Sequence, residues 1–85
     1  MPTYKIVFKR EAQKFIDKQE KSKRLCIYRA IYKLPQETDI KKIKGYSNLY
    51  RLRVGDCRIL YTVDDVIKLI AIENIDNRGD VYKKI

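Results

Sequence analysis

The chain has 85 residues, enough for one small domain with a modest core. It carries 20 lysines and arginines against 11 acidic residues and has no histidine, so its net charge is +9. This balance favours nucleic acid over an anionic membrane surface as the partner, although a basic chain can also pair with an acidic protein. No apolar run is long enough for a membrane span or a signal peptide, so we expect a cytoplasmic protein.

The first half of the chain predicts a strand and two helices. Apolar and polar residues alternate over residues 4–9, which is typical of a strand. Apolar residues recur at helical spacing from Arg10 to Gln19. A second helix, capped by Ser22, is expected to run to about Leu34 and to end before Pro35. Its expected inner side carries Leu25, Tyr28, Ile31 and Tyr32.

The second half predicts an irregular segment at 36–48 and then three strands, Leu49–Val54, Cys57–Val63 and Val66–Ile72. Tight turns are expected at 55–56 and at 64–65, and residues 74–85 form a polar tail. The order β-α-α-β-β-β predicts an α+β fold in a single domain, residues 1–85. In this fold a helical hairpin packs on one face of a small, mainly antiparallel sheet.

The cysteines, Cys26 in a predicted helix and Cys57 in a predicted strand, both have apolar neighbours. We expect buried free thiols rather than a disulfide. The sequence has neither a CxxC pair nor a histidine, so we expect no metal site and no cofactor.

Arginines gather on the sheet face opposite the predicted helices. A two-residue turn that begins with Gly55 puts Arg53 directly across from Arg58. Arg51 lies two residues earlier on the same strand and therefore on the same face. Because opposed like charges are destabilising, we expect a phosphate backbone to offset them. The alternative is a solvated face whose arginines point into water.

Apolar residues are expected beside these arginines, namely Leu60, Leu69 and Ala71. Such a mixed face fits a nucleic-acid cleft, a protein-binding groove or both. The lysines before the hairpin, Lys41, Lys42 and Lys44, either contact an anion or form solvated surface. Tyr46 is a candidate for stacking on a base, whereas Tyr50 and Tyr61 face each other on the other side of the hairpin and are expected in the core.

Two parts of the chain resemble the RelE/ParE toxin superfamily. They are Lys44-Gly45 followed by the YRLRVGDCRILY run of Tyr50–Tyr61, and the ending NRGDVYK of Asn77–Lys83. The resemblance covers almost the whole chain and implies the toxin of a type II toxin–antitoxin pair. RelE-like members cut messenger RNA in the ribosomal A site, whereas ParE-like members inhibit DNA gyrase and are not known as nucleases. The implied partners are an acidic, RelB-like or similar antitoxin, the ribosome and messenger RNA, and the free toxin is expected to be a monomer.

The resemblance also implies roles for individual residues. Arg51 and Arg53 occupy basic positions at which the best-studied members carry lysine, and Arg58 matches a phosphate-binding arginine. Arg78 and Tyr82 match the arginine and the tyrosine of the C-terminal signature. The expected catalytic residues are Arg53, Arg58, Arg78 and Tyr82. The expected RNA-binding residues are Arg51, Lys42, Lys44 and Tyr46.

Two departures from the family pattern bear on the chemistry. Arg53 replaces a lysine proposed for proton transfer, and an arginine keeps its proton and is a poor general base. Asp76 and Asn77 stand where many members have glycine and a basic residue. Tyr82 is then the one neutral proton-transfer group expected near the arginines, unless it is a C-terminal core anchor. A ParE-like inhibitor and a plain nucleic-acid-binding module remain as alternative functions.

Overall fold

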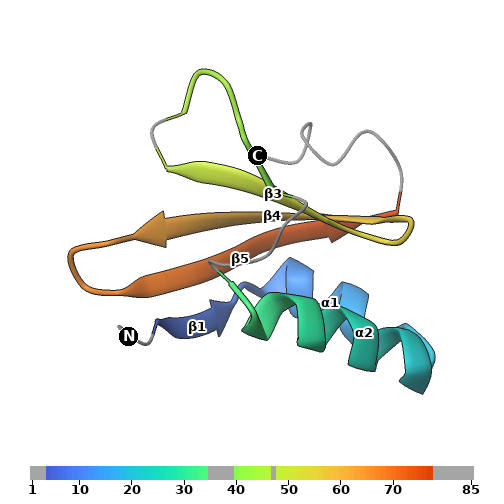
Figure 1. Ribbon diagram of the computed structural model, residues 1–85. Coiled ribbons are helices and arrows are strands. Elements are labelled where there is room, and N and C mark those ends of the chain that lie inside the picture. The colour runs from blue at the N-terminus through green and yellow to red at the C-terminus, as the bar shows by residue number, and fades with distance from the viewer. Residues whose placement is uncertain (1–3, 35–39, 47, 78–85) are drawn as a thin grey trace.

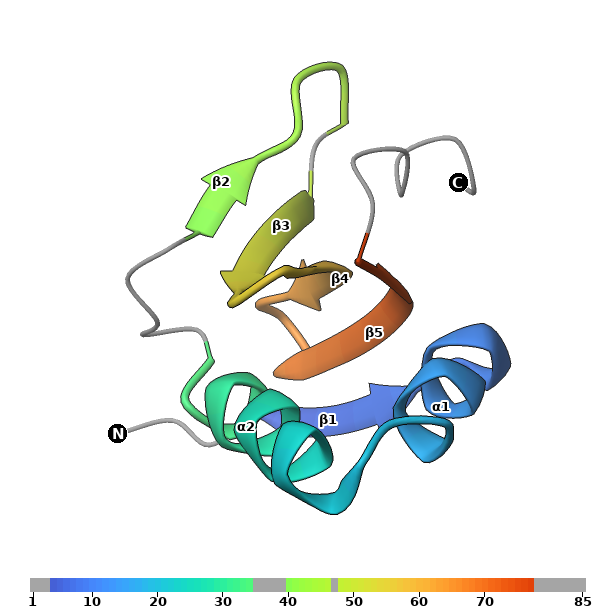
Figure 2. The same ribbon diagram turned by 90° about the vertical axis from the view of Figure 1, so that its right-hand side faces the viewer.

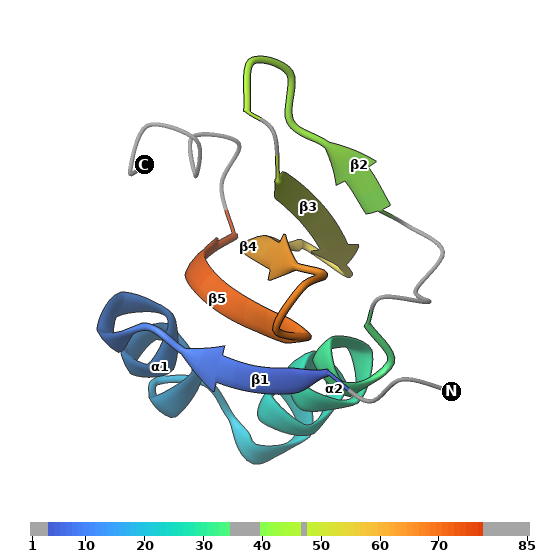
Figure 3. The same cartoon turned by 90° about the vertical axis from the view of Figure 1, so that its left-hand side faces the viewer.

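The computed structural model describes residues 4–34, 40–46 and 48–77. Its elements are β1 (Lys5–Phe8), α1 (Arg10–Asp17), α2 (Lys21–Tyr32), β2 (Ile40–Lys42), β3 (Leu49–Val54), β4 (Cys57–Asp64) and β5 (Leu69–Asp76). Figure 1 labels all of them except β2, which Figures 2 and 3 label. The strands form a five-stranded sheet in the order β1-β5-β4-β3-β2. β1 runs parallel to β5, and the other neighbouring strands are antiparallel.

Both helices lie on one side of the sheet, as Figures 2 and 3 show from two directions. This arrangement confirms the predicted α+β fold with a helical hairpin on a mainly antiparallel sheet. Neither helix of the described residues is both long and apolar enough to cross a membrane.

The helices bury narrow stripes of small and aliphatic side chains. In α1 the buried residues are Ala12 and Ile16, one helical turn apart. In α2 they are Ile27, Ala30 and Ile31. The predicted inner side of α2 was therefore partly wrong, because Leu25 and Tyr32 are 47% and 63% exposed. The stripe of Ile27, Ala30 and Ile31 therefore faces the core, whereas Leu25 and Tyr32 lie outside it.

The helix ends also differ slightly from the prediction. α1 ends at Asp17 rather than at Gln19, and α2 begins at Lys21 with Glu20, not Ser22, at the N-cap position. These shifts of one or two residues leave the helical hairpin itself as predicted.

The main core lies between the helices and one sheet face. The sheet contributes Leu52, Cys57, Ile59, Tyr61, Ile70, Ile72 and Ile75, all buried. The rings of Tyr50 and Tyr61 stack on this side with centroids 5.6 Å apart, which confirms their predicted core position. Both cysteines are free thiols. Cys57 is buried as expected, and burial raises the pKa of its thiol, but Cys26 is exposed.

The segment 36–48 is not irregular throughout, because β2 forms within it. Ile40 pairs with Leu52 of β3, and Lys42 pairs with Tyr50. A three-residue edge strand rich in lysine is a common way to protect a sheet edge from further pairing. A pattern of three residues is too short for sequence analysis to distinguish this edge strand from a surface cluster of lysines.

The last strand was predicted three residues too early. Val66 and Ile67 lie in a turn, in which their backbone N–H groups donate to Asp64 Oδ1 at 3.0 and 3.2 Å. These hydrogen bonds stabilise the turn and outweigh the strand propensity of two β-branched residues. Val66 is 91% exposed, so it gains little from burial in a strand. Lys68 completes the turn with a φ of 56°, and β5 starts at Leu69.

β5 consequently reaches residues that were expected in the polar tail. Asn74 and Asp76 belong to this strand and are only 9% and 3% exposed. The register skips Glu73, because Leu60 pairs with Asn74 whereas Tyr61 pairs with Ile72. This β-bulge switches the faces of the last residues, so that Ile72 and Ile75 both enter the main core.

Candidate functional site

The β3–β4 hairpin brings two arginines together at one end of the sheet. Gly55 opens the turn with a φ of 58°, a conformation that glycine adopts without strain. Val54 then pairs with Cys57 and Arg53 with Arg58, as the sequence predicted. Cross-strand partners point to the same face, so the two guanidinium groups share the face opposite the helices.

We call this surface the arginine face and define it by Arg51, Arg53 and Arg58. Arg53 is exposed, whereas Arg51 and Arg58 are half-buried. Arg51 is aligned with Leu60, two register positions away from the Arg53–Arg58 pair and therefore on the same face. The structure therefore places all of these arginines on one surface, where they can donate paired hydrogen bonds to phosphoryl oxygens.

An acidic residue completes the row that contains the opposed arginines. Asp76 of β5 pairs with Arg58 on the side of β4 away from β3. Figure 1 shows that β5 ends beside the β3–β4 turn, so the row Arg53–Arg58–Asp76 crosses three strands at this end of the sheet. The sequence marked Asp76 only as a departure from the family pattern and assigned it to the tail, because the bulge at Glu73 could not be foreseen.

The other half of the arginine face is apolar and covered. Leu49 and Leu60 are buried there, and Ile43 packs against them as a second small core. Leu60 was expected to lie exposed beside the arginines, but it is fully buried. The exposed apolar surface on this face is thus smaller than the sequence suggested.

The predicted RNA-binding lysines divide between the two sheet faces. Lys41 pairs with Arg51 and shares the arginine face, whereas Lys42 pairs with Tyr50 on the opposite one. Lys44 and Tyr46 are exposed in the segment that follows β2. The structure therefore brings Lys41, rather than Lys42, next to the arginines. Arg78 and Tyr82, the remaining candidates, lie outside the described residues.

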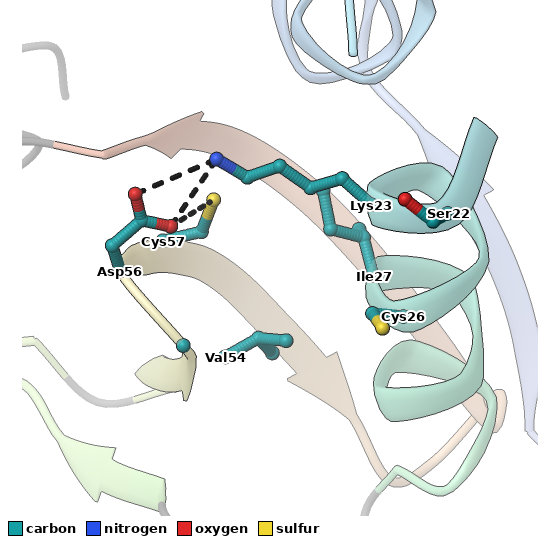
Figure 4. A pocket seen from close by; sticks show the side chains of 8 residues that line it. Ser22, Lys23, Cys26, Ile27, Val54, Asp56 and Cys57 are labelled. Atoms are coloured by element: carbon teal, nitrogen blue, oxygen red, sulfur yellow. Dashed lines mark hydrogen bonds and ion pairs between the residues drawn. The ribbon is translucent and has the colours of Figure 1, made fainter. Parts of the chain in front are cut away.

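The arginine-bearing turn is tied to α2. Lys23 Nζ lies 3.2 Å from Asp56 Oδ1, and the Cys57 thiol donates to the same oxygen at 3.6 Å (Figure 4). The hydrogen bond from Lys23 lowers the pKa of the Asp56 carboxyl, and the same bond raises the pKa of Lys23. This Lys23–Asp56 brace links the helical layer to the hairpin beside a groove of about 320 Å³ that Ile27 and Val54 help to line.

Sequence comparison associates the chain with toxins of type II toxin–antitoxin systems. The model of the ParE toxin of the parDE type II toxin–antitoxin system matches residues 4–82. Toxin RelE3 of Methanocaldococcus jannaschii is 46% identical over 44 residues, which cover 52% of this chain and 48% of that protein. The chain thus spans about half the length of this curated relative.

Structural comparison gives matches over nearly the whole chain. The archaeal RelE–RelB complex from Pyrococcus horikoshii OT3 matches with 27% identity and a TM-score of 0.75, covering 92% of this chain and 98% of that one. The RelB–RelE antitoxin–toxin complex from Methanococcus jannaschii matches with 29% identity and a TM-score of 0.73, covering 93% and 98%.

Proposed function

We propose that this chain, which belongs to the RelE/ParE toxin superfamily, is the toxin of a type II toxin–antitoxin pair and cuts messenger RNA on the ribosome. The observation that carries the proposal is the pairing of Arg53 with Arg58 on the sheet face that the helices leave uncovered. Two arginines at directly opposed positions suit a phosphodiester, whose non-bridging oxygens gain negative charge during cleavage.

In the proposed reaction the 2′-hydroxyl of one nucleotide attacks the adjacent phosphorus. The bond between phosphorus and the 5′-oxygen breaks, which leaves a 2′,3′-cyclic phosphate and a free 5′-hydroxyl. Arg58, supported by Arg53, donates to the non-bridging oxygens and stabilises the pentavalent state. The Tyr82 hydroxyl gives its proton to the 5′-oxygen, water takes the proton of the 2′-hydroxyl, and exchange with water restores Tyr82.

This proton chemistry is weak, because the chain contains no histidine and its arginines stay protonated. The proposal therefore assigns much of the rate to the ribosome, which holds the message in a reactive geometry. Alignment of a nucleophile with its target can lower a barrier by about 7–11 kcal/mol. Arg51 and Arg78 are proposed to hold the flanking backbone, and Lys44 and Tyr46 to contact neighbouring nucleotides.

The proposed partner is an acidic antitoxin that acts in the same cytoplasm. The two solved relatives described above are complexes of RelE with RelB. The net charge of +9 on this chain would favour an acidic protein segment that orders when it binds. Co-purification with the product of a neighbouring gene, followed by dissociation in salt, tests this part of the proposal.

The deciding experiment is primer extension on a message that is being translated in the presence of the purified protein. We expect new 5′ ends only when ribosomes are present, and a loss of about 10²–10³-fold with Arg58→Ala. Lys14→Ala, which removes an exposed positive charge from α1, is the matched control and should cleave normally. An intact message with the folded parent protein would refute the nuclease function.

A ParE-like inhibitor is the second candidate, because the matching family model is that of ParE and the chain lacks histidine. In that case growth arrest would persist while the message stays intact, and the protein would inhibit DNA supercoiling by gyrase.

A further inference from the structure

The row Arg53–Arg58–Asp76 contains its own counter-charge. Arg53 and Arg58 are directly opposed, which is unfavourable when the face is empty. Asp76 is the partner of Arg58 on the other side of β4, so its side chain lies on the same face. The Cβ atoms of such neighbours are about 4.5–5.5 Å apart, close enough for a carboxylate to attract a guanidinium group.

The burial of Asp76 supports this reading. The residue is 3% exposed, and an ionised carboxylate removed from water needs positive charge nearby. Arg58 is the register partner of Asp76 on the adjacent strand, and Arg53 lies one strand further along the same row. The row therefore places one buried acidic residue on the same face as two arginines at the end of the sheet.

The bulge in β5 is what puts Asp76 in this place. With an unbroken register from Tyr61 and Ile72, Arg58 would face Ile75 and the acidic residue would lie one step further along. Because Glu73 is skipped, Ile75 enters the main core and Asp76 comes opposite Arg58. The bulge thus fixes both the core position of Ile75 and the place of Asp76 in the row Arg53–Arg58–Asp76.

We propose that Asp76 is a positioning residue that acts as an internal counter-ion of Arg58 and Arg53. It stabilises the opposed arginines in the free protein, and a phosphate that binds to Arg58 must compete with it. The proposal rests on the proposed function only for the choice of RNA as the anion. It predicts that the parent chain binds free RNA weakly and depends on other contacts to bring a phosphate into the row.

The test is binding of a 2′-O-methyl RNA oligonucleotide, which has no 2′-hydroxyl and cannot be cut by 2′-hydroxyl attack. We expect Asp76→Asn to bind about tenfold more tightly than the parent at low salt. The logarithmic salt dependence should steepen by about 0.7, the value for one further phosphate contact on a single strand. Damage to the fold would weaken binding, so a gain in affinity separates the proposed role from a merely structural one.

Glu20→Gln is the matched control, since it makes the same change in net charge at an exposed residue beside α2. Its affinity should stay within about twofold of the parent, because distant exposed charges are screened by salt. Equal affinity of Asp76→Asn and the parent would overturn the proposal, as would an equal gain from Glu20→Gln. Neither result depends on cleavage, so the proposed nuclease function would be judged separately by primer extension.

A stability cycle keeps the proposal testable if Asp76→Asn is too unstable for binding measurements. Removing one of the opposed arginines should relieve their repulsion most when the counter-ion is missing. Arg53→Gln should therefore raise the urea midpoint in the Asp76→Asn background more than it does in the parent. The same shift in both backgrounds would show that Asp76 does not balance the arginine row.

Discussion

The two faces of the central strands differ in what they bury, as the neighbouring residues Ile59 and Leu60 show. Both are fully buried, but Ile59 lies in the main core beneath the helices and Leu60 lies in the small cluster with Leu49 and Ile43. Beyond that cluster the second face carries the arginine row. Because most apolar burial is on the helical side, the other side can hold charges that would be costly in a core.

The largest expected effect is a loss of stability on the helical side of the sheet, where the main core lies. Ile59→Ala should lower the free energy of unfolding by about 4 kcal/mol, because it leaves a cavity among closely packed side chains. Leu60→Ala, from the smaller cluster, should cost about 2 kcal/mol. Urea denaturation of both variants measures the difference. Equal losses would mean that the two faces contribute similarly to stability, so that the helical side is not the dominant core.

The next effect concerns the proton transfer that we propose for Tyr82. Tyr82→Phe keeps the ring and removes the hydroxyl, so a role in proton transfer predicts a loss of about 10²-fold in single-turnover cleavage on the ribosome. Tyr82→Ala separates packing from chemistry, since a core anchor would instead show a lower urea midpoint. Unchanged cleavage by the Phe variant would leave the arginines alone as the catalytic groups.

Local patterns were enough to predict the β3–β4 hairpin. Its turn begins with glycine, its strands alternate, and the opposition of Arg53 and Arg58 follows from the turn length. The fold class was also accessible, because two helical periods precede a series of strands. These features depend on residues close together in the sequence, where propensity and periodicity act.

Other features depend on partners that are distant in the sequence. β2 is defined by pairing with β3, and the start of β5 depends on the Asp64 carboxylate, which bonds the amides of the following turn. The bulge at Glu73 is favoured because it lets Ile72 and Ile75 share the main core. Asp76 could not be placed beside Arg58 before that bulge was known, so the counter-charge of the site escaped prediction.

The smallest expected effect tests the link between the helical layer and the arginine-bearing hairpin. Lys23→Gln removes the ion pair with Asp56, which is largely solvent-exposed, and should lower the urea midpoint only slightly at pH 7. Lys21→Gln makes the same change in charge on the same helix and should have less effect still. A measurable loss of RNA binding in Lys23→Gln alone would show that the brace also positions the arginines.

The pH dependence of the difference in urea midpoint between the parent and Lys23→Gln shows whether the ion pair with Asp56 causes it. Lys23 lowers the pKa of Asp56 below its ordinary value of 3.8, so the carboxylate is favoured more in the folded chain than in the unfolded one. The stabilisation should therefore be fully present above pH 4 and disappear as the pH falls through the folded pKa. At the alkaline end, Asp56 raises the pKa of Lys23 above 10.5, so the same contribution should be lost only at still higher pH.

Urea midpoints of parent and Lys23→Gln should converge in acid and stay apart at neutral pH. A constant gap across the acid range would mean that Lys23 acts through the packing of its aliphatic chain against the groove rather than through its charge.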